Sequence, residues 1–248
     1  MPSEPLRLCA VSRDYGSVKI LQNINLEIHT GEFLVIVGPS GCGKTTLLNL
    51  LSGFDTPSSG SVERNGIVRT VYQSDGLFPW LTAGENIELG LRDLPEQERK
   101  AARRELLALI RMEDFEDHYP YQLSGGMNQR VELARALAGK SDILLLDEPF
   151  SSLDYQTRLR MRRELVRLLH ERPRTVVFVT HDIEEAAQLA DRVVVLTNRP
   201  STIQKEYIVD TPRPRELTHP DVVRVTERIL HDLGLEGDSS DAQVLNVQ

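Results

Sequence analysis

The stretch EFLVIVGPSGCGKTTLLNLLSG, residues 32–53, joins an apolar run to a glycine-rich turn and a leucine-rich segment. The apolar run is typical of a strand that is buried on both faces. The leucine-rich segment has the composition of a helix, and Gly53 is a suitable residue to end it. The sequence therefore predicts a strand, a loop and a helix in direct succession.

The loop in this stretch, GPSGCGKTT, fits the pattern G-x-x-x-x-G-K-[ST]. Its glycines allow backbone N–H groups to surround phosphates, and the N-terminus of the following helix favours negative charge. In such a loop Lys44 reaches the β- and γ-phosphates, and Thr45 offers its hydroxyl to Mg²⁺. We predict that the loop binds ATP through Gly38, Pro39, Ser40, Gly41, Cys42, Gly43, Lys44, Thr45 and Thr46.

The composition of the 248 residues is that of a globular protein, with 40% hydrophobic and 27% charged residues. The net charge of −8 argues against broad binding to nucleic acid, which we do not expect as a partner. Two cysteines are too few for a disulfide framework. No apolar run approaches the roughly 18 residues that a membrane-spanning helix needs. We therefore expect this chain to reach a membrane only by docking to other subunits.

A second motif, ILLLDE at residues 143–148, is an apolar strand that ends in two adjacent carboxylates. An isolated Asp-Glu pair is more typical of a solvated strand end, but here it accompanies a phosphate loop. Neighbouring side chains at a strand end point in different directions. We predict that Asp147 orients the Mg²⁺ shell and that Glu148 is a catalytic residue that polarises the attacking water.

A third motif, LSGGMNQRVELARAL at residues 123–137, begins with a serine and two glycines that open a helix. This arrangement predicts a second anion-binding helix N-terminus in the same chain. A capped helix with a Gly-Gly hinge would fit the local chemistry equally well.

The LSGGMNQR segment resembles the signature of ABC transporter ATPases, and the motifs follow that family's order along nearly the full chain. The resemblance implies that Tyr15 stacks on adenine and that His181 contacts the γ-phosphate. It also implies that Gln73 is a ligand of Mg²⁺ and a catalytic residue, and that it lies in the loop that links the Mg²⁺ site to a helical insertion. The segment SSLD, which ends at Asp154, would contact a second subunit.

In that family two subunits enclose two ATP molecules, and each site combines the Lys44 loop of one chain with the signature of the other. The implied signature contacts are Ser124, Gly125 and Gly126. The partner would be a second copy of this chain or a related ATPase subunit. The implied mechanism is closure of the dimer on ATP, in-line attack of water assisted by Glu148, and reopening after hydrolysis.

The fold that the resemblance implies is α/β, a P-loop NTPase core with a mainly parallel sheet, an N-terminal antiparallel β subdomain and a helical insertion. The alternation of apolar strands and helices along the chain predicts the same parallel sheet. We expect one ABC ATPase domain at 1–237, with a core at 1–72 and 140–200, the insertion at 73–139, an extension at 201–237 and a disordered tail at 238–248.

The apolar segment QSDGLFPWLTAGENIELGL, residues 73–91, contains Leu77, Phe78, Trp80 and Leu81. These side chains could form an exposed patch that receives a membrane subunit, or they could pack inside the insertion. The segment is similar to that of nitrate, sulfonate and taurine importers, although RPS at 199–201 departs from the Pro-Gly of that group. Such ATPases lie peripherally on the cytoplasmic face of the inner membrane. They work with integral membrane permease subunits and an extracytoplasmic solute-binding protein to take up a small solute.

Overall fold

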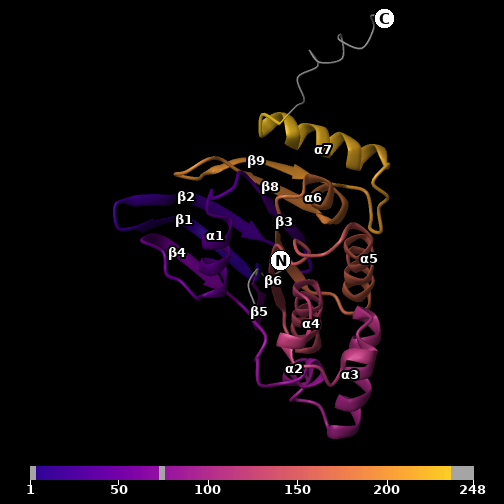
Figure 1. The fold of residues 1–248 in the computed structure, drawn as a ribbon. Helices are drawn as coiled ribbons and strands as arrows, with labels where there is room; N and C mark the ends of the chain where they lie inside the picture. The colour runs from indigo at the N-terminus through magenta and orange to yellow at the C-terminus, as the bar shows by residue number, and fades with distance from the viewer. Residues whose placement is uncertain (1–3, 73–75, 236–248) are drawn as a thin grey trace, which may run out of the picture.

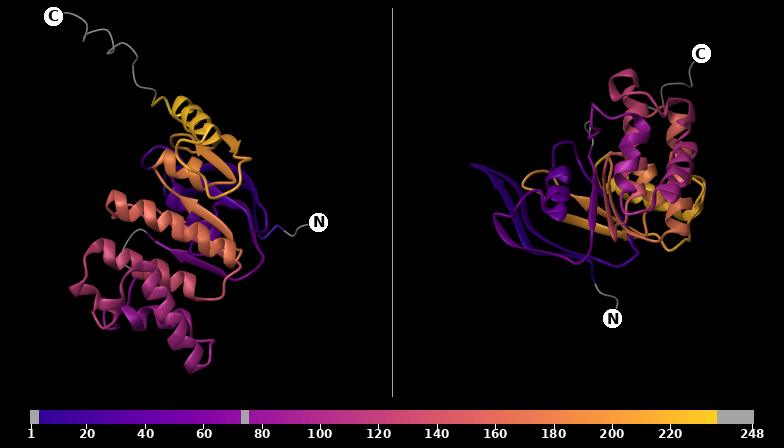
Figure 2. Two further views of the ribbon diagram at one scale, coloured as in Figure 1. Left: turned by 90° about the vertical axis from the view of Figure 1, so that its right-hand side faces the viewer. Right: turned by 90° about the horizontal axis from the view of Figure 1, so that it is seen from below.

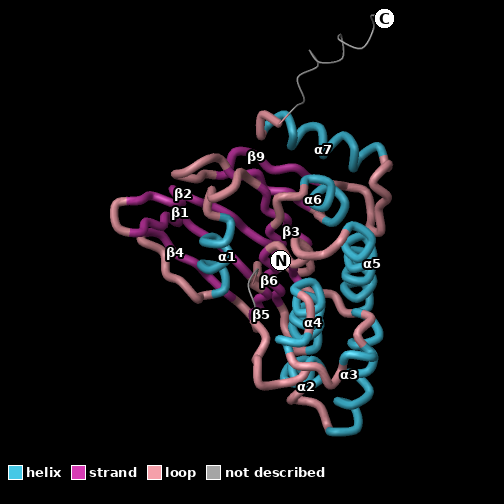
Figure 3. The backbone as a smooth tube through the Cα atoms, in the orientation of Figure 1, coloured by secondary structure: helices cyan, strands magenta, loops and turns pink. Residues whose placement is uncertain are grey.

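One β-sheet runs through the middle of the molecule and a smaller one lies at its left side, with most helices at the right (Figures 1 and 3). The computed structural model describes residues 4–72 and 76–235. In this part of the chain a six-stranded sheet has the order β5-β6-β7-β3-β8-β9, and a three-stranded antiparallel sheet has the order β2-β1-β4. The six-stranded sheet is parallel except for its last strand. The predicted α/β fold is confirmed.

The central strands of the six-stranded sheet are buried on both faces. Its strands are β3 (Phe33–Val37), β5 (Val68–Val71), β6 (Ile143–Asp147), β7 (Thr175–Val179), β8 (Arg192–Leu196) and β9 (Ile203–Ile208). Side chains of β3 alternate between two cores: Phe33, Val35 and Val37 pack in one, and Leu34 and Ile36 in the other. Because parallel strands end at the same edge, the residues that follow β3, β6 and β7 lie close together.

The antiparallel sheet is built on the N-terminal strands β1 (Leu6–Tyr15) and β2 (Val18–Ile28). Its third strand is β4 (Ser59–Arg64), which pairs with β1 instead of forming a local hairpin. A Cβ atom at Gly60 would lie 2.4 Å from the Ala10 carbonyl oxygen, and Gly60 has φ of +82°. Glycine is therefore required where β4 crosses β1.

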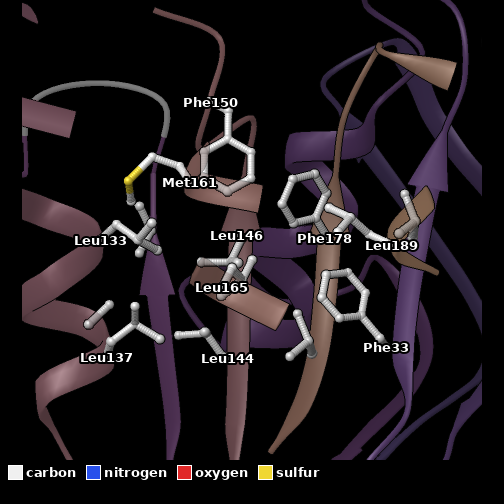
Figure 4. Close-up of a cluster of buried hydrophobic side chains, with 14 of the residues drawn as sticks. Phe33, Leu133, Leu137, Leu144, Leu146, Phe150, Met161, Leu165, Phe178 and Leu189 are labelled. Atoms are coloured by element: carbon white, nitrogen blue, oxygen red, sulfur yellow. The ribbon is translucent and has the colours of Figure 1, made fainter. Parts of the chain in front are cut away.

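The two faces of the parallel sheet are covered by different elements. Helix α1 (Lys44–Ser52) packs its leucines in a core shared with β1 and β2. The opposite face carries α5 (Tyr155–Glu171) and α6 (Ile183–Leu189). Figure 4 shows the core on this opposite face, in which Phe33, Phe150 and Phe178 lie beside leucines of β6 and α4.

The predicted helical insertion is present and lies at one end of the molecule, as Figures 1 and 2 show. Its helices are α2 (Ala83–Gly90), α3 (Glu96–Ile110) and α4 (Gly125–Ala138), with short 3₁₀ turns at Glu113–Phe115 and Pro120–Gln122. Thr82 begins α2 with a reciprocal pair of hydrogen bonds to Glu85. Pro95 is the N-cap of α3.

A strand that the sequence did not predict, β9, follows residue 200 and pairs antiparallel with β8. It therefore belongs to the central sheet. Helix α7 (Pro220–Asp232) packs Val222, Val225 and Ile229 into the core that contains Phe33, next to α6. Among residues 4–72 and 76–235, no helix combines the length and apolar character needed to cross a membrane.

Candidate functional site

The glycine-rich loop joins the end of β3 to the start of α1, as predicted. Gly43 has φ of +110°, and a Cβ atom there would lie 2.7 Å from Cγ2 of Ile20. The position therefore requires glycine for its backbone conformation and for space. The backbone N–H of Cys42 donates to the Pro39 carbonyl at 3.2 Å, which tightens the turn.

Lys44 and Thr45 lie where the phosphate loop becomes helix α1. The Lys44 ammonium donates to the carbonyls of Gly38 at 2.8 Å and Pro39 at 3.1 Å, so it is held inside the loop. Asp147 ends β6 and is buried, and burial raises the pKa of its carboxyl. A hydrogen bond from the Thr45 hydroxyl opposes that rise in the Asp147 pKa. The Thr45 hydroxyl at the start of α1 and the Asp147 carboxylate at the end of β6 therefore meet.

Glu148 follows β6 in a left-handed conformation, with φ of +47°. Such values are uncommon outside glycine and persist only where surrounding contacts fix the backbone. Its N–H donates to the Val179 carbonyl at 2.9 Å, and its carbonyl accepts from Ser151 Oγ at 2.9 Å and Gln129 Nε2 at 3.1 Å. The Glu148 carboxylate lies 3.1 Å from Nδ1 of His181. The strained backbone thus directs this carboxylate toward His181.

One open cavity of about 770 Å³ collects most of the predicted catalytic and nucleotide-binding residues. It is lined by Tyr15, Ile20, Ser40, Gly41, Gly43, Lys44, Thr45, Thr46, Glu148, His181 and Arg199. The predicted loop residues Gly38, Pro39 and Cys42 do not line it. Gln73 lies outside the described residues.

Tyr15, the predicted adenine contact, lines the cavity with its ring half-exposed. Its hydroxyl donates to Asp55 Oδ2 at 2.6 Å. The guanidinium of Arg13 lies 4.5 Å from the ring centroid. These two contacts fix the orientation of the aromatic ring.

Arg199 is a cavity residue to which the sequence assigned no role. Its guanidinium donates to the Gly41 carbonyl, so it adds a positive charge beside the phosphate loop. The hydroxyl of Ser201 contacts the Cys42 carbonyl and, at 3.0 Å, the Thr197 carbonyl. In the sequence, this turn stands out only for its RPS residues. The spacing of residues along the chain could not predict the contact between Arg199 and Gly41, which are 158 positions apart.

The signature residues lie outside this cavity. Ser124 precedes α4, and its hydroxyl accepts from the N–H of Met127 at 3.3 Å. Ser124 and Gly125 are exposed, and a Cβ atom at Gly125 would meet nothing within 4 Å. The chain therefore presents a second helix N-terminus to solvent, away from its own phosphate loop.

Asp154 also lies outside the cavity and is the N-cap of α5. Its carboxylate accepts from the N–H of Thr157 at 3.0 Å, and hydrogen bonds from the Thr157 side chain and from this N–H lower the pKa of Asp154. The preceding residue, Leu153, is buried, so the SSLD loop is anchored although Ser151, Ser152 and Asp154 are exposed.

Cys42 should be the slower of the two cysteines to react with a thiol reagent. Its side chain is 2% exposed and packs in the apolar core under the phosphate loop. Burial also raises the pKa of the Cys42 thiol, which lowers the population of the reactive thiolate. Titration with dithionitrobenzoate should label the partly exposed Cys9 first, and Cys42 at an equal rate only in urea. Rapid labelling of Cys42 in the native protein would contradict this packing.

The sequence matches the profile of the family described as "ABC transporter" over residues 21–151. The chain belongs to the ABC transporter family. Its relatives include the nitrate import ATP-binding protein NrtD of Synechocystis, 44% identical over 81% of this chain and 79% of that protein. The bicarbonate transport ATP-binding protein CmpD of the same organism is 41% identical over 83% of this chain and 79% of that protein. The aliphatic sulfonates import ATP-binding protein SsuB of Bacillus licheniformis is 41% identical over 88% of this chain and 89% of that protein.

Solved structures of ABC cassettes resemble this ATPase. The dimeric structure of MJ0796, a bacterial ABC transporter cassette, matches with a TM-score of 0.76 and 35% identity, over 84% of this chain and 100% of that chain. A post-hydrolysis state of MJ0796 bound to ADP and Pi matches with a TM-score of 0.75 and 34% identity. The predictions of an ABC ATPase fold and of ATPase activity are confirmed.

Proposed function

We propose that this ABC ATPase energises the import of a small anionic solute through separate permease subunits, and that it works as a head-to-tail dimer. One observation supports the dimer: the phosphate loop and the exposed N-terminus of α4 do not share a cavity. Lys44 lines the cavity, whereas Ser124 opens α4 on another exposed surface. A second copy, or a related ATPase subunit, would bring its Ser124, Gly125 and Gly126 to the ATP bound by Lys44.

The cavity geometry supports a division of work among its residues. The loop and Lys44 bind the ATP phosphates, Tyr15 stacks on adenine and Arg199 adds positive charge at the rim. Glu148 polarises the attacking water, and His181, whose ring lies 3.1 Å from that carboxylate, contacts the γ-phosphate. Closure of the dimer on ATP would complete each site, and hydrolysis would reopen it.

Mg²⁺ fits the residues that are present. The Thr45 hydroxyl and the Asp147 carboxylate are hard oxygen ligands that already contact each other. Among residues 4–72 and 76–235, no cluster of three or more acidic, histidine or cysteine side chains could hold a metal ion. This pattern suits Mg²⁺, which binds with few protein ligands beside substrate phosphates, where it neutralises charge. We propose Gln73 as a further ligand and catalytic group.

The helical insertion offers a docking surface for the permease. Leu77 packs in the core, but Trp80 is 68% exposed and its ring lies 5.4 Å from that of Phe78. A groove of about 380 Å³ lies beside Phe78. It also contains Arg69, Arg92 and Arg135, with Glu132 as its acidic residue. We assign this surface to a cytoplasmic helix of the permease, which sets the ATPase on the cytoplasmic face of the inner membrane.

The substrate group follows from the named relatives, which import or transport nitrate, bicarbonate and aliphatic sulfonates. All three solutes are small anions. We extend that class to this ATPase, with an extracytoplasmic solute-binding protein as the subunit that selects the anion.

Substitution of Trp80 by glutamate should strongly reduce capture of the permease. The ATPase would be co-expressed with candidate permease subunits and purified from detergent-solubilised membranes. Loss of an exposed aromatic anchor should lower the yield of complex about 10-fold or more. The control is Ile208→Glu, which changes an exposed apolar residue on β9, away from the insertion. Equal capture by both variants would contradict the docking surface, and co-purification of rRNA or DNA instead of permease would contradict the importer.

A further inference from the structure

We propose that the Gln129 carboxamide is a positioning group that ties the signature helix α4 to Glu148 and to the SSLD loop. Through it, the phosphate bound at Ser124 in one site would set the orientation of Glu148 in the other site. The inference rests on the proposed dimer, since only there do Ser124 and Glu148 of one chain serve different ATP molecules.

Both ends of the Gln129 side chain are occupied. The residue lies in the second turn of α4 and is 6% exposed. Its Nε2 donates to the Glu148 carbonyl at 3.1 Å. Its Oε1 accepts from the Ser152 N–H at 3.2 Å and from the Ser152 hydroxyl at 2.5 Å. One carboxamide therefore joins α4 to both ends of the turn at residues 148–152.

The bond to Glu148 acts at a strained position. Glu148 has φ of +47°, so its backbone depends on surrounding contacts to stay in place. Its carbonyl accepts from Gln129 Nε2 and from both the N–H and the hydroxyl of Ser151, an exposed residue of the same turn, so Gln129 ties this carbonyl to α4. Loss of the Gln129 donor would remove the contact between this peptide and α4, and we expect the carboxylate to be held less firmly toward His181.

The other end of the connection is the N-terminal turn of α4. Gly126 lies one turn before Gln129 on the same rigid helix. A Cβ atom at Gly126 would lie 3.1 Å from the Ser152 carbonyl and 3.3 Å from a methyl of Leu153, so this turn packs directly on the SSLD loop. A shift of the Ser124 end on binding a partner's phosphate would therefore reach Glu148 and Ser152 together.

The connection extends to the histidine on the far side of the cavity. Arg158 donates from Nη2 to the Leu153 carbonyl at 3.1 Å, and its Nη1 lies 3.5 Å from Asp182. Asp182 is the residue after His181. The SSLD loop is thus held between Gln129 and Arg158. Gln129 also contacts Glu148, and Arg158 also contacts Asp182, the residue next to His181.

Gln129→Glu tests the donor alone. The side chain keeps its size and can still accept from Ser152, but an ionised carboxylate cannot donate to the Glu148 carbonyl. In steady-state ATPase assays on the full chain, we expect kcat to fall about 10-fold and the KM for ATP to change less than twofold. The Hill coefficient for ATP should fall toward 1. Lower pH should narrow the gap to the wild type, because a protonated glutamate donates again.

Two further variants separate positioning from folding. Gln129→Met fills the volume of the Gln129 side chain without a nitrogen or oxygen atom. Its kcat should be lower than that of the wild type at every pH. Asn128→Ala is the matched control from the same turn of α4; its Nδ2 donates to the Pro120 carbonyl at 3.1 Å. Its kcat and Hill coefficient should remain those of the wild type. Thermal melts of all variants would show whether a loss of kcat is a loss of folded protein.

Heterodimers carrying two affinity tags test which site Gln129 serves. One pairs a Glu148→Gln chain with a Gln129→Met chain, so the intact Glu148 lies beside the altered residue; it should be slow. The other pairs a wild-type chain with a chain bearing both substitutions; it should keep the turnover of a one-site dimer.

The reverse order, or unchanged kcat and Hill coefficient in Gln129→Glu, would overturn the inference. The proposed function fails separately, if the wild type neither dimerises in ATP nor hydrolyses it.

Discussion

Replacement of Glu148 by glutamine should lower ATP turnover about 10²-fold or more and leave ATP binding intact. The amide keeps the size of the side chain and the contact distance to His181, but it lacks the negative charge that polarises water. ATP would remain unhydrolysed between two subunits, so the closed dimer should accumulate. Phosphate release measures turnover, and size-exclusion chromatography with light scattering in Mg²⁺ and ATP measures the dimer.

Two controls make the result specific to this carboxylate. Glu184→Gln removes the same charge from an exposed position on α6 and should leave turnover unchanged. Lys44→Ala should lose ATP affinity and stay monomeric, because the ammonium held in the loop is removed. Wild-type turnover in Glu148→Gln, or a monomer in ATP with normal affinity, would contradict the role assigned to Glu148.

The parallel sheet and its loops were predictable because their signals are local. The apolar run before Gly38 and the apolar strand before Asp147 each predict a strand buried on both faces, and the structure confirms both. Strand β9 was missed because IQKEYI has a polar, largely exposed middle and pairs only at the sheet edge. Its structure depends on β8, which local composition does not describe.

The same distinction holds within the site. Lys44, Glu148 and His181 belong to motifs, and the structure brings all three to one cavity. Arg199 contacts Gly41 across 158 positions of sequence, and Gln129 contacts Glu148 from another element. Such contacts follow from how the sheet and the insertion pack, so residue types and spacing along the chain could not indicate them.

A buried ion network holds the segment around His181, and it involves residues outside every motif. Arg162 of α5 and Glu185 of α6 are each 3% exposed. Arg162 donates to Glu185 at 2.8 Å and to Asp182 at 2.6 Å. The other Glu185 oxygen accepts from the Thr180 hydroxyl at 2.5 Å. Thr180 and Asp182 flank His181, so the network anchors both neighbours of that residue.

Arg162→Met should therefore destabilise the protein by about 3–5 kcal/mol at pH 7, because it leaves the Glu185 carboxylate buried without its cation. Urea unfolding without nucleotide measures the loss. The double variant Arg162→Met, Glu185→Leu should recover most of it, since no buried charge then remains. A double variant as unstable as the single one would show that packing, not charge, causes the loss.

The pH dependence of that loss has a definite sign. Burial raises the pKa of Glu185 above its ordinary 4.5, and Arg162 opposes the rise. Without Arg162 the folded-state pKa should rise further, so the folded variant binds a proton that the unfolded chain releases. The extra instability should grow as pH rises from 4.5 through the folded pKa and stay constant above it. It should shrink in acid, where Glu185 is neutral, and a loss independent of pH would contradict the assignment to this carboxylate.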